Sequence, residues 1–173
     1  MAFYQGDLKS ARGFYQQAVN TASKGKVPDT LLIAKTNLAR VAIAEGHPQS
    51  AIADLRAAIQ TAGSLHLRYY AVRSSVDLAH ALINTKDHAR ARDELDSALG
   101  QSEKLGLRLE TARIHYFLGR ILDLAGNTSE ASTQYAQARN LLDEIKKEPG
   151  AEHLAERFDL REMSAARAGA TAR

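Results

Sequence analysis

The chain has 173 residues, of which 45% are hydrophobic and 25% charged, a composition typical of a globular domain rich in helix-forming residues. Its 23 Lys and Arg residues are nearly balanced by 20 Asp and Glu residues, so bulk charge alone does not indicate a polyanionic partner. Cysteine is absent, which excludes disulfides, thiolate catalysis and sulfur-based zinc sites and favours a reducing, cytoplasmic location.

A 40-residue internal repeat dominates the chain. Each copy has a small residue, a large residue four positions later and a second small residue three positions after that. These are Ala11, Tyr15, Ala18; Ala51, Leu55, Ala58; Ala91, Leu95, Ala98; and Ala131, Tyr135, Ala138. A turn glycine precedes the first alanine by five residues at Gly6, Gly46 and Gly126, and Lys86 takes its place in the third copy. A period of this length indicates an all-α solenoid in which each repeat buries its apolar face against its neighbours.

The first repeat is incomplete. The segment from Phe3 to Asp7 matches only the last turn of a helix whose earlier turns are absent, so we expect the chain to be a piece of a longer protein. The next helix carries Phe14, Tyr15 and Val19, and its apolar face lacks a cover. We therefore expect a homodimer through the incomplete N-terminal repeat.

Three full repeats follow, each with two amphipathic helices. Apolar residues at helical spacing predict a helix over 30–45, and Pro48 suits the first turn of the next helix, which follows Gly46. The same pattern predicts helices over 68–85, 88–104, 108–125 and 128–147. The array is thus expected to occupy residues 1–147.

The periodicity stops after Pro149-Gly150. Residues 151–163 have the pattern of one more amphipathic helix, with Leu154, Phe158 and Leu160 pointing inward. We expect residues 148–163 to cap the last repeat, and residues 164–173 to form a flexible tail.

The pattern resembles the tetratricopeptide repeat over about residues 3–147. The fourth copy is the most similar, with Leu118-Gly119, Leu122, Gly126-Asn127, Ala131, Tyr135 and Ala138. The 40-residue period resembles the longer-helix variant of regulators of G-protein signalling and of bacterial signalling proteins. The resemblance implies a right-handed α-α superhelix, a non-catalytic role in protein–protein interaction and a place in a larger bacterial signalling protein.

In this family the first helix of each repeat lines a concave face that binds partner segments. The positions equivalent to that face carry a row of cations with neighbouring aromatic, amide and apolar residues: Arg40, His80, Arg120, Arg73, Arg113, Tyr116, Asn37 and Ile83. Arginine binds carboxylates with two parallel hydrogen bonds, so we expect an acidic or extended peptide as the ligand. The alternative is that these arginines are solvated surface paired with Asp77, Glu110 or Asp123.

The remaining motifs do not indicate catalysis or a cofactor. No pair among the six histidines has the i, i+4 spacing of a helical metal site, and there is no glycine-rich phosphate loop or nucleophile-and-base motif. No apolar run reaches the ~18 residues needed to span a bilayer. Two other functions remain open. One is a structural or dimerisation spacer. The other is RNA binding through Tyr69-Tyr70 with Arg90, Arg92 and Arg108, although acidic neighbours of these arginines cancel much of their positive potential.

Overall fold

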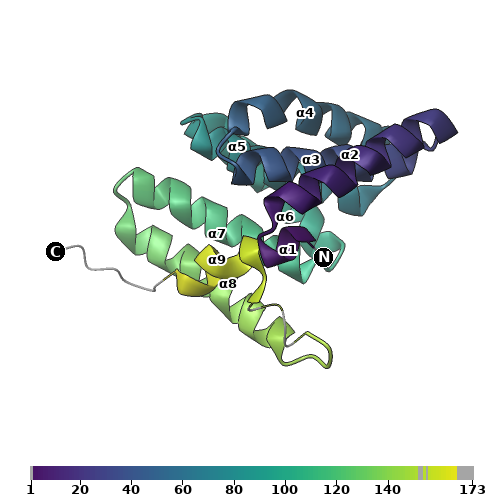
Figure 1. Cartoon of the computed structure of the whole chain (residues 1–173). Helices are drawn as coiled ribbons and strands as arrows, with labels where there is room; N and C mark the ends of the chain where they lie inside the picture. Colours follow the sequence, from purple (N-terminus) through teal and green to yellow (C-terminus); the bar gives the residue numbers. More distant parts are fainter. Residues whose placement is uncertain (1, 152–153, 155, 167–173) are drawn as a thin grey trace. The chain divides into compact units, whose positions relative to one another are not determined.

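The computed structural model describes residues 2–151, 154 and 156–166, and these residues form an all-α structure (Figure 1). The chain divides into two compact units, Met1–Glu94 and Leu95–Arg173, with the division inside one helix, α6. The helices are α1 (Ala2–Gln5), α2 (Leu8–Gly25), α3 (Pro28–Ala44), α4 (Pro48–Ser64), α5 (Arg68–Asn84), α6 (His88–Lys104), α7 (Arg108–Leu124), α8 (Thr128–Lys146), the 3-10 helix η2 (Phe158–Leu160) and α9 (Arg161–Ala165).

The turns between helices explain why the helix bounds recur so regularly. A residue with positive φ, between 52° and 83°, follows every helix from α1 to α7 at intervals of 20 residues, namely at Gly6, Lys26, Gly46, His66, Lys86, Gly106 and Gly126. In the turn after α3, the N–H of His47 donates to the carbonyl of Ala42 at 2.8 Å, closing a Schellman motif around Gly46. The left-handed residue ends each helix at the same register.

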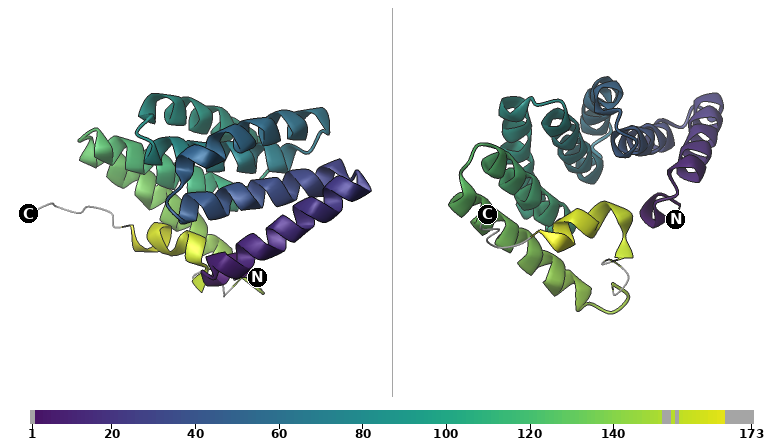
Figure 2. Two further views of the ribbon diagram at one scale, coloured as in Figure 1. Left: turned by 45° about the horizontal axis from the view of Figure 1, so that its top comes forward. Right: turned by 60° about the vertical axis from the view of Figure 1, so that its left-hand side comes forward.

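In unit 1, consecutive helices lie side by side and bury their small and aliphatic residues. The α3–α4 pair contacts along its length, and α5 packs on α4 (Figures 1 and 2). Leu32, Ala58 and Ala62 form one buried cluster with the partly buried Leu67, while Phe3 of α1 is buried beside α2. The repeated alanines are thus positions of close helix approach.

In unit 2, α7 and α8 form a tight helical hairpin. Gly119 of α7 lies against the ring of Tyr135 of α8, and a Cβ at Gly119 would meet ring atoms Cδ1 and Cε1 at 2.7 Å. The short α9 packs on this pair, as both views in Figure 2 show. Within the described part of the chain, none of the helices combines the length and the apolar character that a bilayer crossing requires.

The segment after α8 differs from its prediction. The expected single helix over 151–163 is wrong, because the chain forms a 3-10 turn over Phe158–Leu160 and a five-residue helix over Arg161–Ala165. Leu160 is fully buried as expected, whereas Phe158 is half-buried. The expected flexible tail over 164–173 lies mostly outside the described residues, which end at Ala166.

Candidate functional site

Arg40 lies in the interior of unit 1. It extends from α3, is 6% exposed, and places its Nε 3.5 Å from Oδ2 of Asp77 on α5. The ring of Phe3 stacks on its guanidinium, whose Cζ is 4.5 Å from the ring centroid. A buried cation needs such a partner because desolvation penalises an isolated charge. The Arg40 charge is therefore neutralised within the fold.

Two further polar contacts join α3 and α5. Arg73 donates from Nη2 to Oδ1 of Asn37 at 2.9 Å, and both side chains are half-buried. The hydroxyls of Thr36 and Ser74, both buried, lie 3.5 Å apart. The face of α3 predicted to bind a partner is thus in large part the face on which α5 packs.

One of the predicted arginines of unit 2 is also buried. Arg113 is 7% exposed and donates from Nη1 to Oε2 of Glu110 at 2.8 Å, one turn earlier on α7. Like Arg40, it has a carboxylate partner from its own unit.

Burial corrects the prediction of the groove for three of its residues. Arg40, Arg113 and Ile83 are each less than a tenth exposed, so the expectation that they line an accessible binding groove is wrong. The physical reason is that the fold buries these three side chains, and the two arginines have carboxylate partners that match their charge. The other five predicted residues, Asn37, Arg73, His80, Tyr116 and Arg120, are half-buried.

Tyr116 holds the most informative of these five positions. Its hydroxyl donates to Oε2 of Glu162 on α9 at 3.0 Å, and its ring centroid lies 5.9 Å from that of Tyr135. Burial of the phenol and the negative charge of Glu162 raise the pKa of Tyr116, while the positive charge of Arg120 acts in the opposite direction. Tyr116 therefore remains a neutral hydrogen-bond donor beside a carboxylate.

Arg120 lies one turn further along α7 and differs from Arg40 and Arg113. It is half-buried, and among the described residues no carboxylate forms an ion pair with it. Its charge acts on both Tyr116 and Tyr135. Tyr116, Tyr135 and Arg120 thus form a small aromatic and cationic patch on the α7–α8 hairpin, which we call the α7 patch.

Sequence reasoning missed two features. Glu162 was expected only as part of a cap, and its pairing with Tyr116 has no signal in the repeat pattern because it lies beyond the repeats. A shallow pocket between α3 and α4 is lined mainly by apolar residues, among them Leu31, Leu32 and Ala57, and has Lys35 and Asp54 at its rim. None of the eight predicted site residues lines that pocket.

The arginines considered for RNA binding are largely engaged. Arg90 pairs with Asp87, and Arg108 pairs with Glu144 at 3.2 Å and with Glu148. Over the residues that the structure describes, no group of three or more His, Asp or Glu side chains is arranged to hold a metal ion.

Comparison with known proteins is consistent with this architecture. Residues 70–144 match the family model of the tetratricopeptide repeat. Among solved structures, the chain is similar to BtubC (BKLC) from P. vanneervenii, with a TM-score of 0.64 and 20% sequence identity over 91% of this chain. The match covers 66% of the BtubC chain, just under two thirds of it. No curated protein sequence matches the chain.

The family match covers the last two repeats, and the 40-residue spacing of helices and turns extends the same pattern to the first two. Tetratricopeptide repeats are generally non-catalytic and mediate protein–protein interaction. The chain is thus an all-α helical repeat protein whose residues 70–144 belong to the tetratricopeptide repeat family.

Proposed function

We propose that the chain is a non-catalytic interaction module that binds an acidic or extended segment of a protein partner at the α7 patch. The observation that supports this most directly is the hydrogen bond from Tyr116 to the carboxylate of Glu162. A phenol kept neutral by burial, next to a cation, is suited to hold a carboxylate from a partner in the same way.

Arg120 supplies the charge in this proposal. The planar guanidinium binds a carboxylate with two parallel hydrogen bonds, and partial burial strengthens that contact relative to one in water. In unit 1, the half-buried Asn37, Arg73 and His80 are proposed separately, as a second set of contacts for a partner segment. Arg40 and Arg113 are not included, because their charges are already matched.

Charge reversal at Arg120 tests the proposal. Peptides selected on the full chain from a random display library should be enriched in Asp and Glu, and Arg120→Glu should weaken their binding at least about tenfold, measured by fluorescence anisotropy. The matched control is Arg139→Glu on α8, also half-buried, which should leave affinity unchanged. Selected peptides without acidic residues, or equal effects of the two variants, would reject the α7 patch as the binding site.

A second candidate function is a structural or dimerisation spacer, which one observation favours. Phe14 on α2 is 64% exposed, although the equivalent positions in the other repeats carry the polar residues Asp54, Glu94 and Gln134. An exposed aromatic ring at an otherwise polar position marks a surface that association would cover.

We place the module in the cytoplasm, as part of a larger signalling protein. The lack of cysteine and the long repeat period support this placement. RNA binding has less support, because Arg90 and Arg108 already pair with carboxylates and would have to release them to neutralise phosphates.

A further inference from the structure

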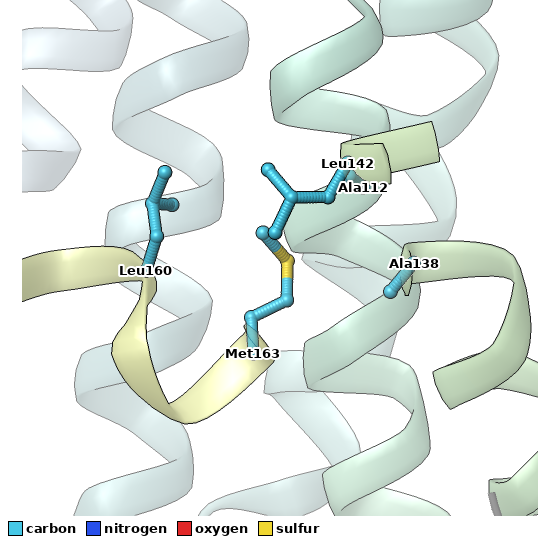
Figure 3. Packing of buried hydrophobic residues seen from close by; sticks show 5 residues of the cluster. All are labelled: Ala112, Ala138, Leu142, Leu160 and Met163. Atoms are coloured by element: carbon cyan, nitrogen blue, oxygen red, sulfur yellow. The ribbon is translucent and has the colours of Figure 1, made fainter. Parts of the chain in front are cut away.

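The segment after α8 occupies the surface of the α7–α8 hairpin with two apolar side chains. Leu160 of η2 and Met163 of α9 are 0% and 2% exposed and form one cluster with Ala112, Ala138 and Leu142. Figure 3 shows the Met163 side chain extending toward Leu142 of α8. The ring of Tyr116 packs against the same cluster.

A carboxylate accompanies the two apolar side chains. Glu162 lies directly before Met163, is itself exposed, and accepts the hydrogen bond of Tyr116 at 3.0 Å. The contact therefore has the chemistry of peptide recognition: two buried apolar anchors and an acidic group on an aromatic donor. Tyr116 is the member of the α7 patch that takes part in this contact, and the two apolar anchors lie against the neighbouring Ala112, Ala138 and Leu142.

The segment that makes this contact has little structure of its own. A three-residue 3-10 turn and a five-residue helix do not persist in isolation, because helix nucleation is unfavourable at such lengths. Neither has a side-chain hydrogen bond at its N-cap. By contrast, α3 and α5 are 17-residue helices joined by a buried ion pair. A local ion pair joins Asp159 to Arg157 at 2.7 Å, and the side-chain contacts of Leu160, Glu162 and Met163 attach the segment to the hairpin.

We propose that residues 158–163 are an intramolecular ligand of the α7 patch, exchangeable with a partner segment of the same chemistry. That partner carries two apolar side chains three positions apart and a carboxylate adjacent to the second, as Leu160, Glu162 and Met163 do. The inference rests on the proposed function, because it assigns a ligand class and an occupied resting state to the same surface. The partner competes with the chain's own segment and binds only when that segment is released.

A peptide added in trans tests the exchange. The probe is a fluorescein-labelled synthetic peptide of residues 157–166, and the protein is the full chain, either wild type or L160A/M163A. We expect the peptide to bind the variant at least tenfold more tightly than the wild type, because the variant's own segment no longer competes. A peptide with Glu162→Gln should bind the variant more weakly than the unmodified peptide, since it lacks the acceptor charge.

A second variant keeps the test decisive if L160A/M163A does not fold. Glu162→Arg changes an exposed side chain and removes the carboxylate that accepts the hydrogen bond of Tyr116, so it loosens the segment while leaving Leu160 and Met163 in place. It should also bind the added peptide more tightly than the wild type, with a wild-type circular dichroism spectrum. If both variants are folded and neither binds the peptide, the segment is a permanent part of unit 2 and the proposal is overturned.

The two proposals fail in distinguishable ways. In one outcome, Arg120→Glu weakens the binding of the library-selected acidic peptides, and the 157–166 peptide does not bind. That outcome would overturn the exchange and leave the proposed function intact. Selected peptides that do not depend on Arg120 would reject the proposed function itself.

Discussion

Among single residues, the same register position can carry opposite roles in different repeats. Arg40 is buried against Asp77, whereas Arg120, 80 residues later, is half-buried with no ion pair among the described residues. The 40-residue spacing correctly placed both on first helices of repeats. The sequence offered Asp77 as a possible partner on a solvated surface, but it could not indicate that the pair of Arg40 and Asp77 would be buried.

The pair Gly119 and Tyr135 gives a prediction about packing. We expect Gly119→Ala to destabilise the chain by up to about 2 kcal/mol, because overpacking against the Tyr135 ring costs ~1–3 kcal/mol and the gain in helix propensity offsets roughly 1 kcal/mol of that cost. The equivalent pairs are Ala39 with Leu55 and Ala79 with Leu95. The double variant G119A/Y135L reproduces that pairing and should recover most of the loss.

Thermal and urea unfolding followed by circular dichroism measure both changes. Tyr135→Phe is the control for the hydroxyl group alone and should leave the Gly119→Ala penalty in place. A stabilising effect of Gly119→Ala in the wild-type background would show that the Tyr135 ring moves aside without cost.

At the level of helices and turns, the left-handed residues determine where the helices end. Four of the seven turn positions are glycines, which adopt positive φ at little steric cost, and the other three are Lys26, His66 and Lys86. Lys86, with φ of 65°, is in a conformation that costs roughly 1–2 kcal/mol for most L-residues. The sequence marked Lys86 as the exception to the glycine pattern, and the backbone conformation is retained in spite of it.

Replacing that lysine should stabilise unit 1. We expect Lys86→Gly to raise the free energy of unfolding by about 0.5–1 kcal/mol, since glycine adopts positive φ without steric cost but loses more chain entropy on folding. The control is Ala125→Gly, one residue before the equivalent turn glycine and at a right-handed φ of −86°, which should lower stability. Equal effects of both variants in denaturant titrations would contradict a role for the φ angle.

The C-terminal element shows where the pattern ceases to be informative. Periodic apolar residues correctly indicated that Leu160 turns inward, yet the single helix expected over 151–163 did not form. Beyond Pro149-Gly150 the 40-residue pattern stops, so it no longer predicts the register of the backbone. The conformation there depends on how Leu160 and Met163 fit the α7–α8 hairpin.

For the molecule as a whole, the exposed ring of Phe14 leads to a prediction about association. If the chain dimerises through α2, the wild type should sediment as a dimer at tens of micromolar. Phe14→Asp, which introduces the residue found at the equivalent position Asp54, should then be monomeric because it removes the apolar contact and adds charge repulsion.

Gln16→Asp is the matched control, because Gln16 is exposed on α2 but lies about 200° around the helix from Phe14. It adds the same charge and should leave the dimer intact. A monomeric wild type, or a dimer that persists in Phe14→Asp, would exclude α2 as the interface. Sedimentation velocity of the three proteins decides the question.

The helical repeat, the approximate bounds of the long helices and the family could all be predicted from the amino-acid sequence. They follow from local physics, since helix spacing, turn residues and small-residue positions recur every 40 residues and do not depend on distant contacts. Only the tertiary structure showed which of the predicted cations are buried. It also showed that Glu162 is the carboxylate to which Tyr116 donates its hydrogen bond. Burial and pairing depend on the elements that approach a side chain from elsewhere in the chain, and a linear periodicity carries no information about them.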